Sequence, residues 1–410
     1  METVSAPTNI ACIKYWGKAS IPLNTPINSS VSVTLDQTDL RAVTTASASL
    51  SFTSHRLWLN GIEEEVSNSR RFLACLEGVR SLATDKIDEA TGEVIVSKDD
   101  WKNMHVHVSS YNTFPTAAGL ASSAAGYAAL VAAFAKLFNA KETFPGQLST
   151  FARQGSGSAC RSLYGGFVAW RMGGEKEDAT DSFAEQVADE NYWPEIRAVI
   201  LVVSDAKKDT SSTAGMSTSV ATSKLLSYRA KSVVDERMNT IEKAYLNRDF
   251  TTFANVTMAD SNQFHATCLD TFPPIFYMND ISRSVIKAVH AYNDWAGEVR
   301  AGYTFDAGPN AVIYTLDKYS IELAALMLHF YPATAEAKQG YFNNPEILKD
   351  VEAFRLDASL LEAVERTGRT ASAGDVKMIY YTKSGPGPQM LGKDEATIDK
   401  VTGLNKFKPN

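Results

Sequence analysis

Short runs of β-branched and aromatic residues dominate the first part of the chain and predict strands. The first two runs are bounded by Pro, Asn and Gly, as short strands commonly are. Four runs have this character: residues 9–17, 29–35, 41–52 and 56–66. The dipeptide Asn60-Gly61 has the composition of a two-residue hairpin turn, so we expect the last run to fold back on itself.

Helical periodicity begins further along the chain. We expect a helix over 69–82, a polar loop over 84–103 and a strand over 105–112. Bulky apolar residues then recur at helical spacing around and after the sequence FPTAAGLASSAAG (114–126), which predicts a long helix. These residues are Leu120, Tyr127, Leu130, Val131, Phe134 and Leu137.

Residues 151–170 predict a helix, a Gly/Ser break, a second short helix and a strand, whereas the acidic segment 173–191 predicts a loop. The composition changes near Trp193-Pro194, where we expect a domain boundary. Beyond it the pattern predicts a buried strand over 197–205 and helices over about 215–265 and 279–297, with strands between them. The predicted class is α+β, with two domains.

Composition narrows the classes of protein. The chain has 410 residues, of which 44% are hydrophobic and 21% charged, as in soluble globular proteins. Its formal net charge is −7, and no cluster of lysine and arginine exceeds a pair such as Arg70-Arg71. A nucleic-acid-binding surface needs a basic face, so that class is disfavoured.

Cysteine usage and the chain ends indicate the compartment. Four widely spaced cysteines without a CxxC pattern disfavour a disulfide framework or a zinc site and favour a reducing compartment. The first residues lack the apolar core of a signal peptide, and the last three are not a peroxisomal signal. The small-residue run 124–135 is too short to span a bilayer, so we expect a soluble, cytoplasmic protein.

The segment FPTAAGLASSAAG has two interpretations that its residues leave evenly balanced. It follows a strand and opens a helix, where unpaired backbone N–H groups and the helix dipole attract anions. Small side chains would let a phosphate approach, and serine hydroxyls would add donors. Equally, the small residues could pack a helix start against a sheet. The spacing matches neither a Walker A loop nor a dinucleotide-binding fingerprint.

Two further segments could also hold an anion, each with a structural alternative, and a third is a hydroxyl-rich loop before a helix. In GSGSACR (155–161), serine hydroxyls precede Arg161, which can bind a carboxylate or phosphate with two hydrogen bonds, or the segment is a turn with a surface arginine. In KYWGK (14–18), a strand would place Lys14, Trp16 and Lys18 on one face, in an anion cleft or at a solvated edge. The hydroxyl-rich KKDTSSTAG (207–215) could be a simple connecting loop with a helix cap.

Asp306, in TFDAGPNAVIY (304–314), either stabilises a tight turn or acts as a catalytic base. His105 and His107 share one side of a strand, but no third metal ligand is evident, so a metal site is disfavoured. The prolines of GPGPQ (385–389) remove backbone donors, and this segment predicts a turn.

In combination, these motifs resemble the mevalonate diphosphate decarboxylase family of the GHMP kinase superfamily. They occur in family order over about residues 5–315, with KSGPGPQ at 383–389. The matching segments are APTNIACIKYWGK, PINSSVSVTL, YNTFPTAAGLASSAAG, RQGSGSACRS, DAKKDTSSTAGM and FDAGPNA. The resemblance implies a GHMP-kinase-like fold with a deep cleft between two domains, 1–195 and 196–375, and a strand near 375–395 that returns to the first domain.

The resemblance also implies a reaction. ATP phosphorylates the 3-hydroxyl of (R)-mevalonate 5-diphosphate, and loss of that phosphate with CO₂ gives isopentenyl diphosphate for isoprenoid and sterol synthesis. A kinase of the same fold would be expected to lack the equivalents of Asp306 or Lys14, and a sensor without activity would have lost Asp306, Arg161 or the glycine loop. A decarboxylase specific for a monophosphate is harder to exclude, although Lys18, Ser156 and Ser158 favour the diphosphate.

Residue roles follow from the same resemblance. Asp306 matches the carboxylate that orients or deprotonates the 3-hydroxyl, Lys14 matches a lysine that stabilises this carboxylate, and Arg161 matches the residue that binds the substrate carboxylate. The substrate-binding positions are Asn9, Tyr15, Trp16, Lys18, Ser156, Gly157, Ser158 and Arg161. The ATP-binding positions are Asn112, Gly119, Ala121, Ser122, Ser123 and Ser212. Mg²⁺ is expected to arrive on ATP, with no dedicated metal site, and the protein is expected to be a homodimer. Thr213 departs from the arginine of some bacterial relatives.

Overall fold

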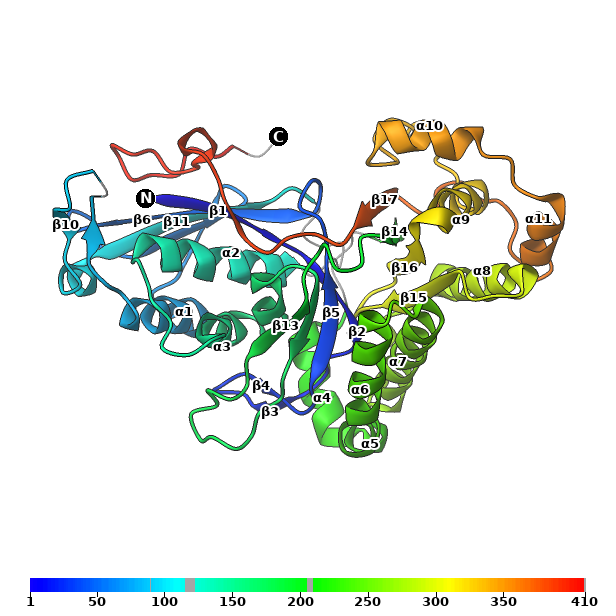
Figure 1. Cartoon of the computed structure of the whole chain (residues 1–410), viewed down its shortest axis with the longest axis horizontal. Coiled ribbons are helices and arrows are strands. Elements are labelled where there is room, and N and C mark those ends of the chain that lie inside the picture. The colour runs from blue at the N-terminus through cyan, green and yellow to red at the C-terminus, as the bar shows by residue number, and fades with distance from the viewer. Residues whose placement is uncertain (89, 115–121, 205–208, 409–410) are drawn as a thin grey trace.

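The first of three main sheets has six strands and lies at one end of the molecule (Figure 1). The computed structural model describes all residues except 89, 115–121, 205–208 and 409–410. The strand order is β18-β1-β6-β11-β7-β8, and only the β7–β11 pair is parallel. The bounds are β1 Glu2–Pro7, β6 Arg41–Ser49, β7 Arg56–Leu59, β8 Ile62–Glu64, β11 His105–Asn112 and β18 Gln389–Met390.

Three helices cover one face of this sheet, and the C-terminal segment crosses the other face (Figure 1). The helices are α1 Arg70–Ser81, α2 Ser122–Leu137 and α3 Gln147–Gly155. Their apolar stripes meet the sheet in one core, in which Phe72, Leu76 and Phe134 are fully buried. On the opposite face, the Phe407 ring stacks on Tyr111 with 4.2 Å between ring centroids.

The second sheet joins the two halves of the molecule. Its order is β13-β12-β5-β2, with β2 Asn9–Ile13, β5 Ser30–Thr34, β12 Phe167–Trp170 and β13 Ala184–Ala188. Phe167 stacks on Tyr245 of the later half, with 4.0 Å between ring centroids and an angle of 1° between the rings. Because these strands share one apolar core with residues of the later half, the position of β2 is fixed by both.

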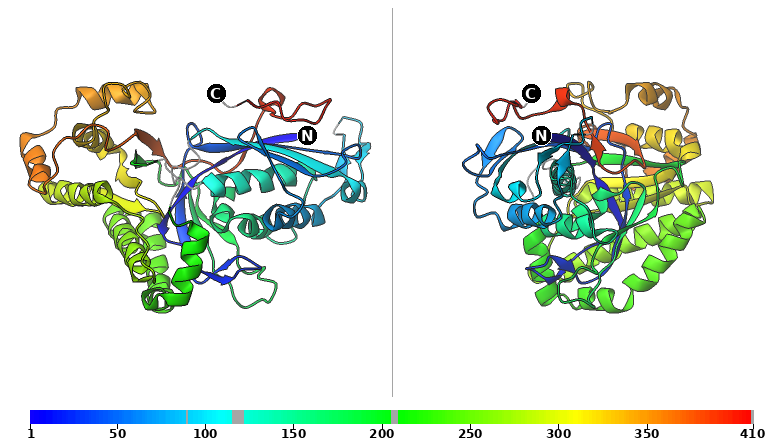
Figure 2. Two further views of the ribbon diagram at one scale, coloured as in Figure 1. Left: turned by 180° about the vertical axis from the view of Figure 1, so that it is seen from behind. Right: turned by 60° about the vertical axis from the view of Figure 1, so that its left-hand side comes forward.

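The third sheet belongs to the later half and is antiparallel throughout, in the order β15-β16-β14-β17. Its strands are β14 Ile196–Val202, β15 Ala301–Phe305, β16 Ala311–Leu316 and β17 Met378–Lys383. The helices are α4 Ser212–Thr222, α5 Lys224–Ser232, α6 Val234–Leu246, α7 Phe250–Asp270, α8 Asp280–Ala296, α9 Asp317–Phe330, α10 Pro345–Ala353 and α11 Ala358–Glu365. Figure 2 shows α4–α7 descending beside β2 and β5, while α8–α11 lie at the far end.

Most predicted elements are present. The Asn60-Gly61 turn is confirmed, since both residues have positive φ (48° and 84°) between β7 and β8. The helix over 69–82 and the strand over 105–112 are confirmed as α1 and β11. The stripe of α2 is buried at Leu130, Val131, Phe134 and Leu137, whereas Leu120 lies outside the described residues.

Two predicted loops are partly wrong. Segment 84–103 contains the hairpin β9 Lys86–Ile87 and β10 Val94–Val96 and a 3₁₀ turn over Asp100–Asn103. Segment 173–191 contains β13, which is held by pairing with β12 although only one of its five residues, Val187, is β-branched. In β10, Val94, Ile95 and Val96 have the β-branched composition of a strand, which the polar residues around them concealed. In β13, pairing with β12 overrides weak local propensity.

The strand expected over 9–17 ends early, at Ile13. Lys14, Trp16 and Lys18 therefore do not share a strand face, and Gly17 has a φ of +97° that a strand does not tolerate. The turn predicted for GPGPQ is wrong: residues 385–388 form an extended connection with one bend at Gly387, and Gln389 already belongs to β18. Among the helices that the structure describes, none combines the length and apolar character needed to cross a membrane.

Candidate active site

A cavity of about 420 Å³ opens where the two halves of the chain meet. Its walls come from β2 and the segment after it, the starts of α2 and α4, the 3₁₀ turn Gly157–Leu163 and the loop after β15. Thirteen of the residues predicted for the site line it: Asn9, Lys14, Tyr15, Trp16, Lys18, Ser122, Ser123, Ser156, Gly157, Ser158, Arg161, Ser212 and Asp306.

Lys14 and Asp306 form an ion pair inside this cavity. Lys14 Nζ donates to Asp306 Oδ1 at 2.7 Å, although the two residues are 292 positions apart in sequence. The lysine side chain is 3% exposed and the aspartate side chain 32% exposed. One carboxylate oxygen is thus held by a buried cation while the aspartate remains accessible from the cavity, as a proton acceptor must be.

Arg161 is held rigidly in a second wall of the cavity. Its Nε donates to Asn9 Oδ1 at 3.2 Å and to Ser32 Oγ at 2.9 Å, and its Nη1 donates to Ser30 Oγ at 2.5 Å. Burial lowers the pKa of this guanidinium. Asn9 is itself oriented, because its Nδ2 donates to Ser162 Oγ at 2.8 Å. Asn9 therefore links Arg161 to the residue that follows it, and the guanidinium is fixed before any ligand enters.

The two serine-rich segments meet in the cavity. Ser123, in the first turn of α2, lies with its Oγ 3.2 Å from Ser156 Oγ. Gly157 leaves no room for a side chain, because a Cβ atom there would lie 2.8 Å from Tyr15 Cε1 and 2.9 Å from Trp170 Cη2. The glycine therefore lets the chain approach the Tyr15 ring closely and places Ser156 and Ser158 at the cavity wall.

Arg71 also lines the cavity, and the sequence interpretation missed it. It comes from the first turn of α1, and its Nη2 donates to Thr213 Oγ1 of α4 at 3.4 Å. Burial and the charge of Arg71 both lower the pKa of Lys18. The pair Arg70-Arg71 is visible in the sequence, but nothing local indicates that α1 turns one of its two arginines toward this site. Asn24 and Phe264 are further lining residues that no motif indicated, and Ser211 lines the cavity from the hydroxyl-rich segment 207–215.

Three predicted nucleotide-site residues are not placed in this cavity. Asn112 ends β11, where its backbone N–H donates to Asn60 Oδ1 at 3.1 Å, and it is not among the residues that line the cavity. Gly119 and Ala121 lie outside the described residues. Ser212 is the first residue of α4, next to Ser211, whose hydroxyl caps the helix by accepting from the backbone of Ala214.

His265 of α7 is buried near the ion pair and should make stability depend on pH. Burial and the charge of Lys14 lower its pKa to about 4 from the ordinary 6.5. Between these values the unfolded chain binds a proton that the folded chain does not, so the free energy of unfolding should fall as pH drops, by up to roughly 3 kcal/mol. Urea unfolding between pH 7 and 4.5 should show a smaller decrease for His265→Leu than for wild type. Exposed His329→Gln is the control, and equal decreases in all three proteins would contradict the expectation.

Comparison with known proteins covers nearly the whole chain. Residues 6–184 match the family model described as the diphosphomevalonate decarboxylase-like N-terminal domain, and residues 198–391 match the mevalonate 5-diphosphate decarboxylase C-terminal domain. The diphosphomevalonate decarboxylase of Rattus norvegicus is 50% identical over 393 residues, covering 95% of this chain and 93% of the relative.

Solved structures show the same likeness. Mevalonate diphosphate decarboxylase from Trypanosoma brucei has a TM-score of 0.86 at 37% identity and covers 97% of this chain and 100% of that chain. A structure described as MDDEF in complex with MVAPP, AMPPCP and magnesium has a TM-score of 0.70 at 28% identity, covering 96% of this chain and 99% of that chain.

Proposed function

This chain belongs to the diphosphomevalonate decarboxylase family, and from that premise we propose how its cleft residues divide the reaction. The enzyme uses ATP to convert (R)-mevalonate 5-diphosphate to isopentenyl diphosphate, with release of ADP, phosphate and CO₂. We further propose that it acts in the cytoplasm as a homodimer, supplies isoprenoid and sterol synthesis, and divides into domains 1–195 and 196–375 with a strand near 375–395 returning to the first.

The charge of the cavity is the observation that carries the assignment. The described lining residues include four cations, Lys14, Lys18, Arg71 and Arg161, but a single carboxylate, Asp306. This cationic lining occurs in a chain whose net charge is −7. Such a cavity suits a substrate that carries a diphosphate and a carboxylate. The single carboxylate, Asp306, can serve as the base at one end of the cavity.

At that end, Asp306 accepts the proton of the tertiary 3-hydroxyl as this oxygen attacks the γ-phosphate of ATP. Lys14 holds and orients the carboxylate through the 2.7 Å contact. Arg161 binds the substrate carboxylate and holds the C1–C2 bond in position. When the 3-phosphate leaves, the electrons of that bond form the C2–C3 double bond and CO₂ departs. The rigid hydrogen bonds of Arg161 support this role, because a preorganised group loses little entropy on binding.

At the other end, we assign the substrate diphosphate to Tyr15, Lys18, Ser156, Gly157, Ser158 and Arg71, with Trp16 in the adjoining wall. Burial and the charge of Arg71 lower the pKa of Lys18, and a diphosphate bound between the two cations would offset their repulsion. Asn9 acts through Arg161, which it orients.

For ATP, the fit rests on α2. Ser122 and Ser123 begin a 16-residue helix whose first turn contains no acidic residue, so backbone N–H groups, hydroxyls and the helix dipole can all face a phosphate. Gly119, Ala121, Asn112 and Ser212 complete the proposed nucleotide site. Mg²⁺ would be held by the nucleotide phosphates, whose charge it offsets.

Arg71→Ala should raise KM for mevalonate 5-diphosphate by about tenfold while kcat changes little, because it removes one charged contact to a non-reacting group. The neighbouring Arg70→Ala is a matched control, since Arg70 donates to Pro22 O and does not line the cavity. Initial rates measured against substrate concentration decide the matter. Equal KM values for the two variants would remove Arg71 from the diphosphate site.

The substrate itself is tested by supplying ATP, Mg²⁺ and either mevalonate 5-phosphate or mevalonate 5-diphosphate, and measuring CO₂. The proposal expects CO₂ from the diphosphate, equal in amount to the ADP formed. Turnover of the monophosphate alone would overturn the diphosphate assignment, and ADP without CO₂ would indicate a kinase.

A further inference from the structure

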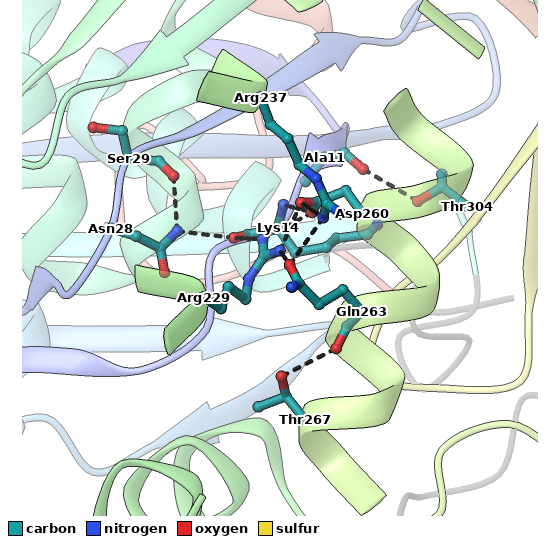
Figure 3. Close-up of polar contacts among 10 residues, drawn as sticks. All are labelled: Ala11, Lys14, Asn28, Ser29, Arg229, Arg237, Asp260, Gln263, Thr267 and Thr304. Atoms are coloured by element: carbon teal, nitrogen blue, oxygen red, sulfur yellow. Dashed lines mark hydrogen bonds and ion pairs between the residues drawn. The ribbon is translucent and has the colours of Figure 1, made fainter. Parts of the chain in front are cut away.

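A cluster of charged side chains from α5, α6 and α7 surrounds the backbone of Lys14, a residue that lines the cavity (Figure 3). Asp260 of α7 and Arg229 of α5 are both fully buried and form a two-pronged ion pair, with Nη1–Oδ1 at 2.6 Å and Nη2–Oδ2 at 2.8 Å. Arg237 of α6 donates to the same Oδ1 at 2.9 Å. Both arginines also donate to Gln263 Oε1, at 2.8 and 2.9 Å. None of these four side chains lines the cavity.

This cluster holds the backbone of Lys14. The Lys14 N–H donates to Asp260 Oδ2 at 2.7 Å, and the Lys14 carbonyl accepts from Arg229 Nη2 at 3.1 Å (Figure 3). Asn28 Nδ2 donates to the same carbonyl at 3.1 Å. Because β2 ends at Ile13, buried side chains of the later half replace the strand partner that Lys14 lacks.

The same turn of α7 also holds the strand that leads to Asp306. Ser261, next to Asp260, accepts a hydrogen bond from the backbone N–H of Phe305 at 3.0 Å. Phe305 is the last residue of β15 and directly precedes Asp306. The strand lies close against the helix, since a Cβ on Gly302 would be 2.7 Å from Ala254 Cβ. Two adjacent residues of one helix therefore fix the chain on both sides of the ion pair.

We propose that Asp260 and Ser261 are positioning residues that set the distance between Lys14 and Asp306 and so control proton transfer from the substrate. The inference rests on the proposed roles of Lys14 and Asp306. In a cluster that served only to stabilise the fold, Asp260 and Gln263 could accept the hydrogen bonds of the two arginines. Such a cluster would need no hydrogen bond to the backbone of Lys14 or of Phe305. Here the carboxylate also accepts from Lys14, and the adjacent hydroxyl accepts from the residue before Asp306.

The test compares Ser261→Ala and Asp260→Asn with Gln263→Ala. Gln263→Ala weakens the same cluster but touches neither Lys14 nor Phe305, so its kcat should match wild type once corrected for the folded fraction. Displacing reacting groups by about 1 Å can lower a rate by about 10²-fold, so we expect kcat to fall about tenfold for Ser261→Ala and about 10²-fold for Asp260→Asn. KM for both substrates should stay unchanged.

Two outcomes overturn the inference. The first is that Ser261→Ala and Asp260→Asn have the same kcat as Gln263→Ala. The second is that the decrease in their kcat is fully explained by the unfolded fraction measured by circular dichroism. If Asp260→Asn leaves Arg229 unpaired and does not fold, Ser261→Ala decides the matter by itself. Asp306→Asn is assayed in parallel. If it retains wild-type turnover, the proposed function fails as well, whereas an inactive Asp306→Asn beside fully active positioning variants overturns this inference alone.

Discussion

Asp306→Asn is expected to abolish the formation of both ADP and CO₂ while leaving the fold intact. Asparagine fills the same space but cannot accept the proton of the 3-hydroxyl, and it leaves the Lys14 ammonium, 2.7 Å away, without its anionic partner. A positioned base contributes about 10²–10⁴-fold to a rate, so we expect a loss of at least this size. The expected loss is checked by measuring ADP and CO₂ formation in the same reaction.

The control for this variant is Asp280→Asn at the start of α8. The Asp280 side chain is 92% exposed and pairs with the nearby Arg283. The Asp280→Asn substitution should leave the rates of ADP and CO₂ formation unchanged. Wild-type turnover by Asp306→Asn would show that the base lies elsewhere. Loss of CO₂ with normal ADP would limit Asp306 to the second half of the reaction.

Arg161→Gln is expected to lower kcat by about 10²–10³-fold, the range typical of a lost electrostatic anchor, with little change in KM for ATP. Glutamine can replace part of the hydrogen bonding to Asn9, Ser30 and Ser32 but carries no charge for the substrate carboxylate. Arg161→Ala should lose as much activity and more stability, because it leaves those buried partners unsatisfied.

Arg153→Gln separates the loss of a buried arginine from the loss of this particular one. Arg153 is equally buried, but its Nη1 donates to the carbonyls of Ala179 and Ser182, and it does not line the cavity. Its replacement should reduce stability more than kcat. If Arg161→Gln raised only the KM for ATP, Arg161 would belong to the nucleotide site instead.

Local chemistry made much of the fold predictable. The Asn60-Gly61 turn and the helix α1 follow from short-range rules, and the structure shows both. The serine hydroxyls of α2 and of the turn before Arg161 were also identified from sequence, and the structure brings them within 3.2 Å of each other at Ser123 and Ser156. Each of these two segments can be identified separately from its own small residues and serines, although the segments lie far apart along the chain.

Long-range partners explain the failures. The strand over 9–17 was expected to continue past Ile13, but Lys14 finds its backbone partners in Asp260 and Arg229, more than 200 residues away. β13 likewise depends on its pairing with β12. Arg71 enters the site because α1 packs beside α3, a contact that the sequence of α1 does not reveal.

A crystal structure of this chain with bound mevalonate 5-diphosphate tests the account most directly. The decisive measurement is the distance from the substrate 3-hydroxyl oxygen to the nearer Asp306 carboxylate oxygen. The account predicts about 2.6–3.2 Å, with the substrate carboxylate on Arg161 and the diphosphate between Lys18 and Arg71. A substrate bound in the reverse direction, with its diphosphate on Arg161 and its 3-hydroxyl out of hydrogen-bonding reach of Asp306, would contradict it.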